Sequence, residues 1–90
     1  MKLSGKEIPK LKSGVYLKDL GGRKLLLIPE GYVELNETAY AILSKCDGNK
    51  SIEDIVKELK GMYAGSEGQI REDVIEVFME LHKEALIDFF

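Results

Sequence analysis

The sequence predicts a small α+β domain, winged-helix-like, in which a three-stranded antiparallel sheet is followed by three helices. Segments of strand type are confined to residues 15–35, and helical periodicity begins only after residue 36. Glycine and proline turns separate these segments. With 90 residues the chain has room for one domain and one modest core. Strands grouped before helices indicate an α+β domain rather than a parallel α/β sheet.

The three predicted strands cover residues 15–20, 24–28 and 32–35. Gly21 and Gly22 can adopt the positive φ angles of a two-residue hairpin between the first two strands. The middle strand reads Leu-Leu-Leu-Ile without alternation, which is typical of a strand covered on both faces. A Pro-Glu-Gly turn leads into the third strand. A meander of this order leaves the first and third strands as edges.

The predicted helices are recognised by their caps and by their apolar periodicity. Asn36 is placed as the N-cap of the first helix, and Gly48 is a left-handed residue after its end. Ser51 and Asp54 form a capping-box pattern at the start of the second helix. A glycine-rich loop is expected over residues 61–68, and the last helix is expected from about Gln69 to about Lys83. The apolar stripes of the three helices are Ala39, Ile42, Leu43 and Cys46, then Ile52, Ile55, Val56 and Leu59, then Ile70, Val74, Val77, Phe78, Leu81 and Ala85.

Charge is unevenly distributed along the chain. Residues 1–24 carry a net charge of +5 and residues 25–90 a net charge of -8. Residues 1–13 are rich in lysine and are expected to form a flexible basic N-terminal arm, either as a solvated tail or in contact with a partner. The folded domain is expected over residues 14–90, with Phe89 and Phe90 folded back onto it.

The sequence offers little catalytic or metal-binding chemistry. Cys46 is the single cysteine and lies on a buried stripe, so a packed thiol is expected in preference to a reactive one. His82 is the single histidine, and nothing near it in the sequence is a nucleophile. We therefore expect no metal, no cofactor and no enzymatic activity. No apolar run reaches the length of a membrane span, and a lone thiol suits a cytoplasmic location.

Residues 25–48 carry the most informative pattern, LLLIPEGYVELNETAYAILSKCDG. Together with matching residues farther along the chain, this segment resembles the PqqD family of pyrroloquinoline quinone (PQQ) biosynthesis, whose members are peptide chaperones, and the wider group of RiPP recognition elements. The similarity spans roughly residues 14–87. One departure is Ala85, where the family usually has glycine. The matched elements are Pro29-Glu30, Leu35-Asn36-Glu37-Thr38-Ala39, Ile42-Leu43, Cys46-Asp47-Gly48, Ser51, Ile55-Val56, Leu59, Asp73-Val74, Phe78, Leu81 and Leu86-Ile87.

The resemblance implies a function without catalysis. Family members bind the leader of a ribosomally made precursor peptide and present it to a modifying enzyme, which in the PqqD case is a radical S-adenosylmethionine (SAM) enzyme. The peptide adds as a strand beside the third strand and lies against the third helix. An open edge supplies backbone hydrogen bonds for such an addition, and it also allows a homodimer. The residues to which this role is carried over are Tyr32, Val33, Glu34 and Leu35 on the strand, and Asp73, Glu76, Val77 and Glu80 on the helix.

Two other functions are compatible with the predicted fold. A winged-helix domain could bind DNA, but residues 70–84 carry a net charge of -3, and such a helix would repel phosphates. No nucleic-acid partner is therefore expected. A generic protein–protein adaptor is the other alternative. Ile75 and Met79 lie one turn apart outside the apolar stripe and form a candidate patch for a partner, unless they pack beneath the C-terminal tail.

Overall fold

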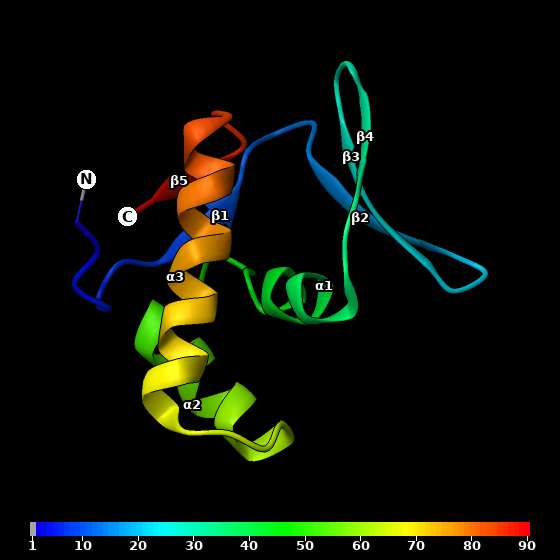
Figure 1. The fold of residues 1–90 in the computed structure, drawn as a ribbon. Helices are drawn as coiled ribbons and strands as arrows, with labels where there is room; N and C mark the ends of the chain where they lie inside the picture. Colours follow the sequence, from blue (N-terminus) through cyan, green and yellow to red (C-terminus); the bar gives the residue numbers. More distant parts are fainter. Residues whose placement is uncertain (1) are drawn as a thin grey trace.

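The computed structural model describes residues 2–90 as five strands and three helices (Figure 1). The strands pack as two separate sheets, one of three strands and one of two. In chain order the elements are β1 (Pro9–Leu11), β2 (Tyr16–Leu20), β3 (Arg23–Ile28), β4 (Gly31–Glu34), α1 (Glu37–Ser44), α2 (Ile52–Met62), α3 (Glu67–Lys83) and β5 (Ile87–Phe89).

The three-stranded sheet is the predicted antiparallel meander, in the order β2-β3-β4. Gly21 and Gly22 close the first hairpin with φ angles of 60° and 96°, a conformation that residues with a side chain rarely adopt. Leu26 lies opposite Leu17 on one side and opposite Val33 on the other, so these three side chains share one face. The α+β class and the three-strand, three-helix order are thus confirmed, whereas the likeness to a winged helix is loose.

The N-terminal residues differ from the expected flexible arm. β1 pairs antiparallel with β5, with Pro9 opposite Phe89 and Leu11 opposite Ile87. The pairing continues outward through hydrogen bonds in both directions between Ile8 and Phe90. The expectation of a flexible arm over residues 1–13 is corrected for residues 5–12, which form backbone hydrogen bonds to α2, to β5 and to Leu86. A three-residue strand whose partner is at the far end of the chain leaves no local pattern in the sequence. Met1, the first residue of that arm, lies outside the described residues.

The helices begin at the predicted caps. The Asn36 side chain accepts a hydrogen bond of 2.7 Å from the Ala39 N–H, and the capping box of Ser51 and Asp54 is complete. The predicted loop over 61–68 is shorter in the structure. α2 continues through Met62, and α3 begins at Glu67 because the Ser66 hydroxyl caps it. Gly61 is tolerated there because it lies in the exposed last turn of α2.

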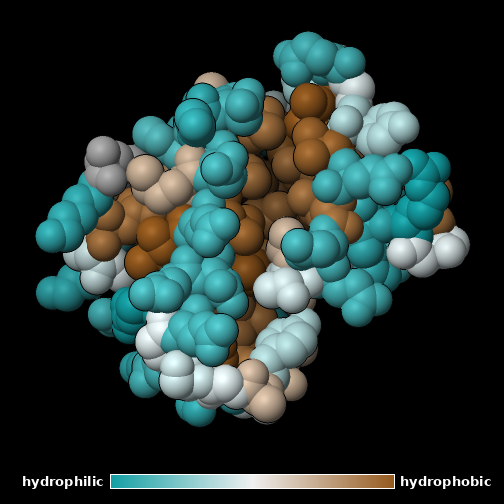
Figure 2. All heavy atoms as spheres, viewed as in Figure 1, coloured by the Kyte–Doolittle hydropathy of each residue, from teal (hydrophilic) through white to brown (hydrophobic). Residues whose placement is uncertain are grey.

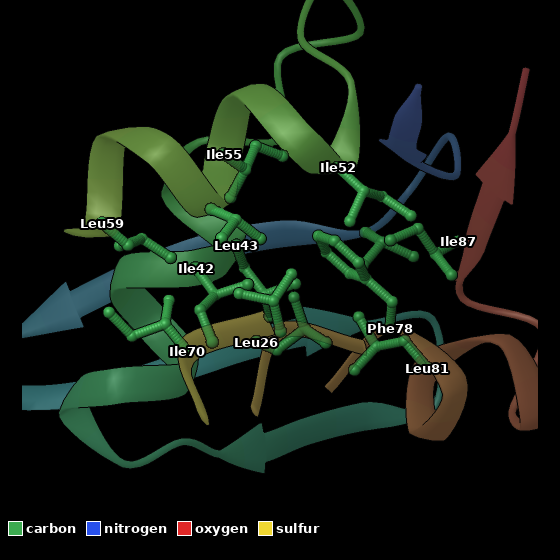
Figure 3. Packing of buried hydrophobic residues seen from close by; sticks show 13 residues of the cluster. Leu26, Ile42, Leu43, Ile52, Ile55, Leu59, Ile70, Phe78, Leu81 and Ile87 are labelled. Carbon is green, nitrogen blue, oxygen red and sulfur yellow. The ribbon is translucent and has the colours of Figure 1, made fainter. Parts of the chain in front are cut away.

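The core lies where the three helices meet the inner face of the three-stranded sheet and β5 (Figure 3). Phe78 of α3 is fully buried, and its ring meets Phe89 edge to face at 6.1 Å between centroids. Ile87 is also buried, so the C-terminal segment folds back as predicted, although the side chain of Phe90 remains 72% exposed. The least exposed hydrophobic side chains are Leu26, Ile42, Leu43, Ile52, Ile55, Val56, Val74, Phe78 and Ile87.

Candidate peptide-binding groove

β4 is an edge strand whose outer side has no strand partner among residues 2–90. The Leu35 N–H donates a hydrogen bond of 2.9 Å to the carbonyl of Lys24 on β3. Because backbone groups of an antiparallel pair alternate in direction, Val33 also points its N–H and C=O toward β3. The N–H and C=O groups of Tyr32 and Glu34 therefore face the open side of the strand.

The side chains of β4 alternate between the two faces of the sheet. Val33 lies on the inner face opposite the buried Leu26, and Leu35 follows it on that face. Tyr32 and Glu34 lie on the outer face, where Arg23 of β3 contacts both of them. The Arg23 Nη2 lies 2.6 Å from Glu34 Oε1, and its guanidinium carbon lies 5.9 Å from the centre of the Tyr32 ring.

A groove separates the inner side of β4 and the start of α1 from one flank of α3. Its main section has a volume of about 460 Å³. Figure 2 shows hydrophobic surface exposed between α3 and the sheet, bordered on the α3 side by hydrophilic side chains. The residues that line this section are Val33, Leu35, Asn36, Thr38, Ala39, Asp73, Glu76, Val77, Glu80 and Leu81.

The groove continues in both directions along α3. Toward the C-terminal end of the helix it opens into a section of about 340 Å³, bounded by Ile28 and Leu86. At the other end Thr38 and Asp73 also border a smaller hollow of about 190 Å³ beneath the loop between α2 and α3. The open edge of β4 therefore lies beside a row of adjoining hollows rather than a flat surface.

One wall of this groove is acidic. Asp73, Glu76 and Glu80 follow one another on the groove side of α3. Glu84 and Glu30 line the section toward the C-terminal end of the helix. Within residues 2–90 none of these five carboxylates forms an ion pair. No lysine, arginine or histidine lines either section of the groove. The apolar floor is thus bordered by uncompensated negative charge.

The structure brings together most of the residues that the sequence singled out. From β4 and its end, Val33 and Leu35 line the groove, whereas Tyr32 and Glu34 contribute backbone groups at its rim. All four residues named on the helix, Asp73, Glu76, Val77 and Glu80, line it as well.

The structure also separates some predicted residues and adds others. Ile75 and Met79 lie on other sides of α3, and both side chains are half-buried rather than exposed. Thr38 and Ala39 of α1 complete the groove and were not singled out as site residues. In the sequence Ala39 belongs to the apolar stripe of the first helix. Helical periodicity marks such a residue as facing inward, but it cannot show whether the side chain lies in the core or at the floor of a groove.

The remaining chemistry-bearing side chains lie outside the groove. The Cys46 thiol packs against the core and lies 3.6 Å from the Ile42 carbonyl. Burial, with a smaller effect of the neighbouring Asp47 carboxylate, raises the pKa of Cys46 to about 12, so the thiol stays protonated at neutral pH. His82 is exposed beside the Phe89 ring. Among the described residues, histidine, cysteine, aspartate and glutamate side chains form no group of three or more that could hold a metal ion. None of the helices in residues 2–90 has the length and apolar character of a membrane span.

Comparison with known proteins identifies the family. The family model of coenzyme PQQ synthesis protein D (PqqD) matches residues 23–87. The chain belongs to the PqqD family. A PqqA binding protein of Azotobacter vinelandii is 41% identical over 80 residues, which cover 87% of this chain and 85% of that protein. The PqqA binding protein of Xanthomonas euvesicatoria pv. vesicatoria is 36% identical, with 88% of each chain covered.

Solved structures share the PqqD fold. One is the solution structure of the PqqD truncation of Methylobacterium extorquens PqqCD, described as a functional, stand-alone RiPP recognition element. It matches with a TM-score of 0.84 and 26% identity over 97% of this chain and 95% of that one. TbiB1 in complex with the TbiA(β) leader peptide matches with a TM-score of 0.75 over 88% and 94% of the two chains. At 20% identity that likeness concerns the fold alone.

Proposed function

We propose that this PqqD-family protein binds the leader of a ribosomally made precursor peptide by strand addition to β4. The observation that carries the proposal is the juxtaposition of the open β4 edge with the groove along α3. The outward N–H and C=O groups of Tyr32 and Glu34 can pair with an extended chain of any sequence, and the groove can receive its alternate side chains. The names of the relatives, PqqA binding proteins, agree with this role.

We further propose that the bound leader is presented to a modifying enzyme in the cytoplasm, a radical SAM enzyme if the pathway is that of PQQ. The protein itself has no catalytic role in this proposal. Ile75 and Met79 are our candidates for contact with that enzyme, because they lie away from the groove and leave it free for the peptide. DNA binding is disfavoured, because the acidic wall of α3 would repel phosphates.

The decisive experiment removes one hydrogen-bond donor from the open edge. Glu34→Pro deletes an outward N–H but no hydrogen bond to β3, and proline is tolerated on a strand edge in this orientation. Val33→Pro would be unsuitable, because the Val33 N–H faces β3. Glu34→Ala is the matched control, since it removes the ion pair with Arg23 and keeps the N–H.

Binding is measured by calorimetry with a synthetic PqqA peptide of Azotobacter vinelandii, and the fold of each variant is checked by circular dichroism. Glu34→Pro should weaken binding by about fivefold or more, the effect of one backbone hydrogen bond, while Glu34→Ala should bind nearly as the unmodified protein does. Equal affinity of a folded Glu34→Pro variant would refute strand addition to β4. Sedimentation in the absence of peptide distinguishes a homodimer that uses the same edge.

A further inference from the structure

We infer that the groove is selective for an extended peptide segment that points apolar side chains and at least one lysine or arginine inward. This inference rests on the proposed function, and it adds the chemistry of the ligand. The inference concerns the side chains of the bound peptide, here called the guest strand, that point toward the groove. Those on its other face lie beside the Arg23–Glu34 ion pair, whose charges already compensate each other.

The register of β4 fixes which guest side chains enter the groove. A guest strand bonded to the outward groups of Tyr32 and Glu34 has one residue directly opposite Val33. Residues that lie opposite each other in adjacent strands share a face of the sheet, so this guest side chain points inward, as do those two positions before and after it. About three alternate guest residues therefore face the groove along β4.

The floor beneath those positions is apolar. Val33 and Leu35 come from the β4 side, and Val77 and Leu81 come from α3, one helical turn apart. Val33 is 41% exposed in the free protein, although it belongs to the inner face of the sheet. A guest side chain of the size of valine or leucine would remove this surface from water, which favours apolar residues at inward positions.

The α3 wall adds a requirement for positive charge. Asp73, Glu76 and Glu80 are spaced by three and four residues, so their carboxylates are neighbours on successive turns and repel one another. The basic residues of this helix, Arg71, His82 and Lys83, do not line the groove, and Arg71 lies close to Gly5. A guest lysine or arginine can lay its apolar stem along Val77 and bring its charge to this wall. A guest aspartate or glutamate would meet like charge in a partly dehydrated site.

The experiment is a selection of short random displayed peptides by the immobilised protein at low salt. The inference predicts alternating apolar residues in the selected peptides, with an excess of lysine or arginine at the alternating, inward positions. Glu76→Gln/Glu80→Gln should lose this excess and bind a selected basic peptide about fivefold less tightly, the effect of two exposed ion pairs. Glu67→Gln/Glu72→Gln is the matched control. It removes two charges from the same helix outside the groove and should leave binding unchanged.

The outcomes separate this inference from the function on which it rests. Selected peptides that lose affinity for Glu34→Pro but show no basic excess would overturn the charge requirement and leave strand addition intact. If Glu76→Gln/Glu80→Gln and Glu67→Gln/Glu72→Gln bound a basic peptide equally well, the charge requirement would again be overturned and strand addition would stand. Failure to select any peptide, together with no binding of the PqqA peptide, would overturn both.

Discussion

The backbone N–H of Glu53, in the first turn of α2, donates a hydrogen bond of 2.9 Å to the carbonyl of Gly5. The preceding N–H, of Ile52, donates one of the same length to the carbonyl of Glu7. The N–H groups of Ile52 and Glu53 lie in the first turn of the helix and would otherwise have no hydrogen-bond partner. The next N–H, that of Asp54, donates to the Ser51 hydroxyl. The N-terminal segment is thus a cap on α2 as well as a strand partner of β5.

Gly5→Ala should therefore destabilise the domain. Gly5 has φ of +102°, and an added Cβ would lie 2.8 Å from the Glu53 Cγ. The combined backbone strain and steric clash should lower the free energy of unfolding by about 1–3 kcal/mol in a denaturant titration. Gly61→Ala is the control, because Gly61 is helical and has open space around it. That change should stabilise the protein by about 0.5–1 kcal/mol. Similar effects of the two changes would contradict the capping role of the N-terminal segment.

The contrast between the two sheets shows what the sequence could and could not predict. The β2-β3-β4 meander is encoded by local signals, namely Gly21-Gly22 and the Pro-Glu-Gly turn, which join neighbouring segments. The pairing of β1 with β5 joins residues about eighty positions apart, and neither three-residue strand has a period of its own. Local propensity carries no information about such a contact. The helix caps, in contrast, could be predicted from the sequence because each is defined by residues within four positions of one another.

Ala85→Gly should stabilise the domain. Ala85 has φ of 57° and follows Glu84, the C-cap of α3. Its N–H donates to the carbonyl of His82, and the Leu86 N–H donates to that of Leu81. This is a Schellman motif with alanine in the left-handed position that glycine usually occupies. Relief of about 1–2 kcal/mol of backbone strain exceeds the extra entropy of glycine in the unfolded chain, so a net gain of about 0.5–1 kcal/mol is expected.

Thermal and denaturant unfolding measure this gain, and Ala41→Gly within α1 is the control. Glycine lacks the helical preference of alanine, so the control should lose about 1 kcal/mol. A destabilised Ala85→Gly variant would show that the positive φ angle at this position is not the source of strain.

Acid should weaken the cap formed by the N-terminal segment. The Glu7 carboxylate accepts hydrogen bonds from the Ser4 N–H and also from the Gly5 N–H and the Ser4 hydroxyl. These bonds, that of the Ser4 N–H foremost, lower the pKa of Glu7 from its ordinary 4.5 to about 2. A carboxyl whose pKa is lower in the folded state stabilises that state above its ordinary pKa. This contribution should be lost as the pH falls from about 4.5 to about 2.

Unfolding titrations at several pH values test this expectation. Glu7→Gln should be less stable than the unmodified protein at pH 6, and the difference should shrink as the pH approaches 2. Glu72→Gln controls for the loss of one negative charge. A Glu7→Gln deficit that is the same at all pH values would mean that the ionised carboxylate is not what stabilises the segment.

The candidate site, like the fold, could be predicted from the sequence where a local pattern defines it. Alternation along β4 correctly separated Val33 from Tyr32, because strand geometry has a fixed period of two. The acidic flank of α3 was also predictable from helical spacing. Which side chains of α1 would meet that flank depends on the crossing of two helices and a sheet. Thr38 and Ala39 could therefore be assigned to the groove only from the fold.

The two sides of α3 should respond differently when a peptide binds. Val77 lines the groove, whereas Ile75 does not, so a bound leader should bury Val77 and leave Ile75 unchanged. Val77→Thr keeps the shape of the side chain and replaces one methyl group with a hydroxyl. The hydroxyl can bond the Asp73 carbonyl one turn earlier, but it takes the place of the methyl group that would contact an apolar guest residue. PqqA peptide affinity measured by calorimetry should fall by about tenfold, which corresponds to about 1.4 kcal/mol. Ile75→Thr introduces the same hydroxyl on the other side of the helix and should leave peptide affinity within about twofold, even if it lowers stability. Equal losses of affinity in the two variants would show that the peptide does not lie along the flank of α3 that contains Val77.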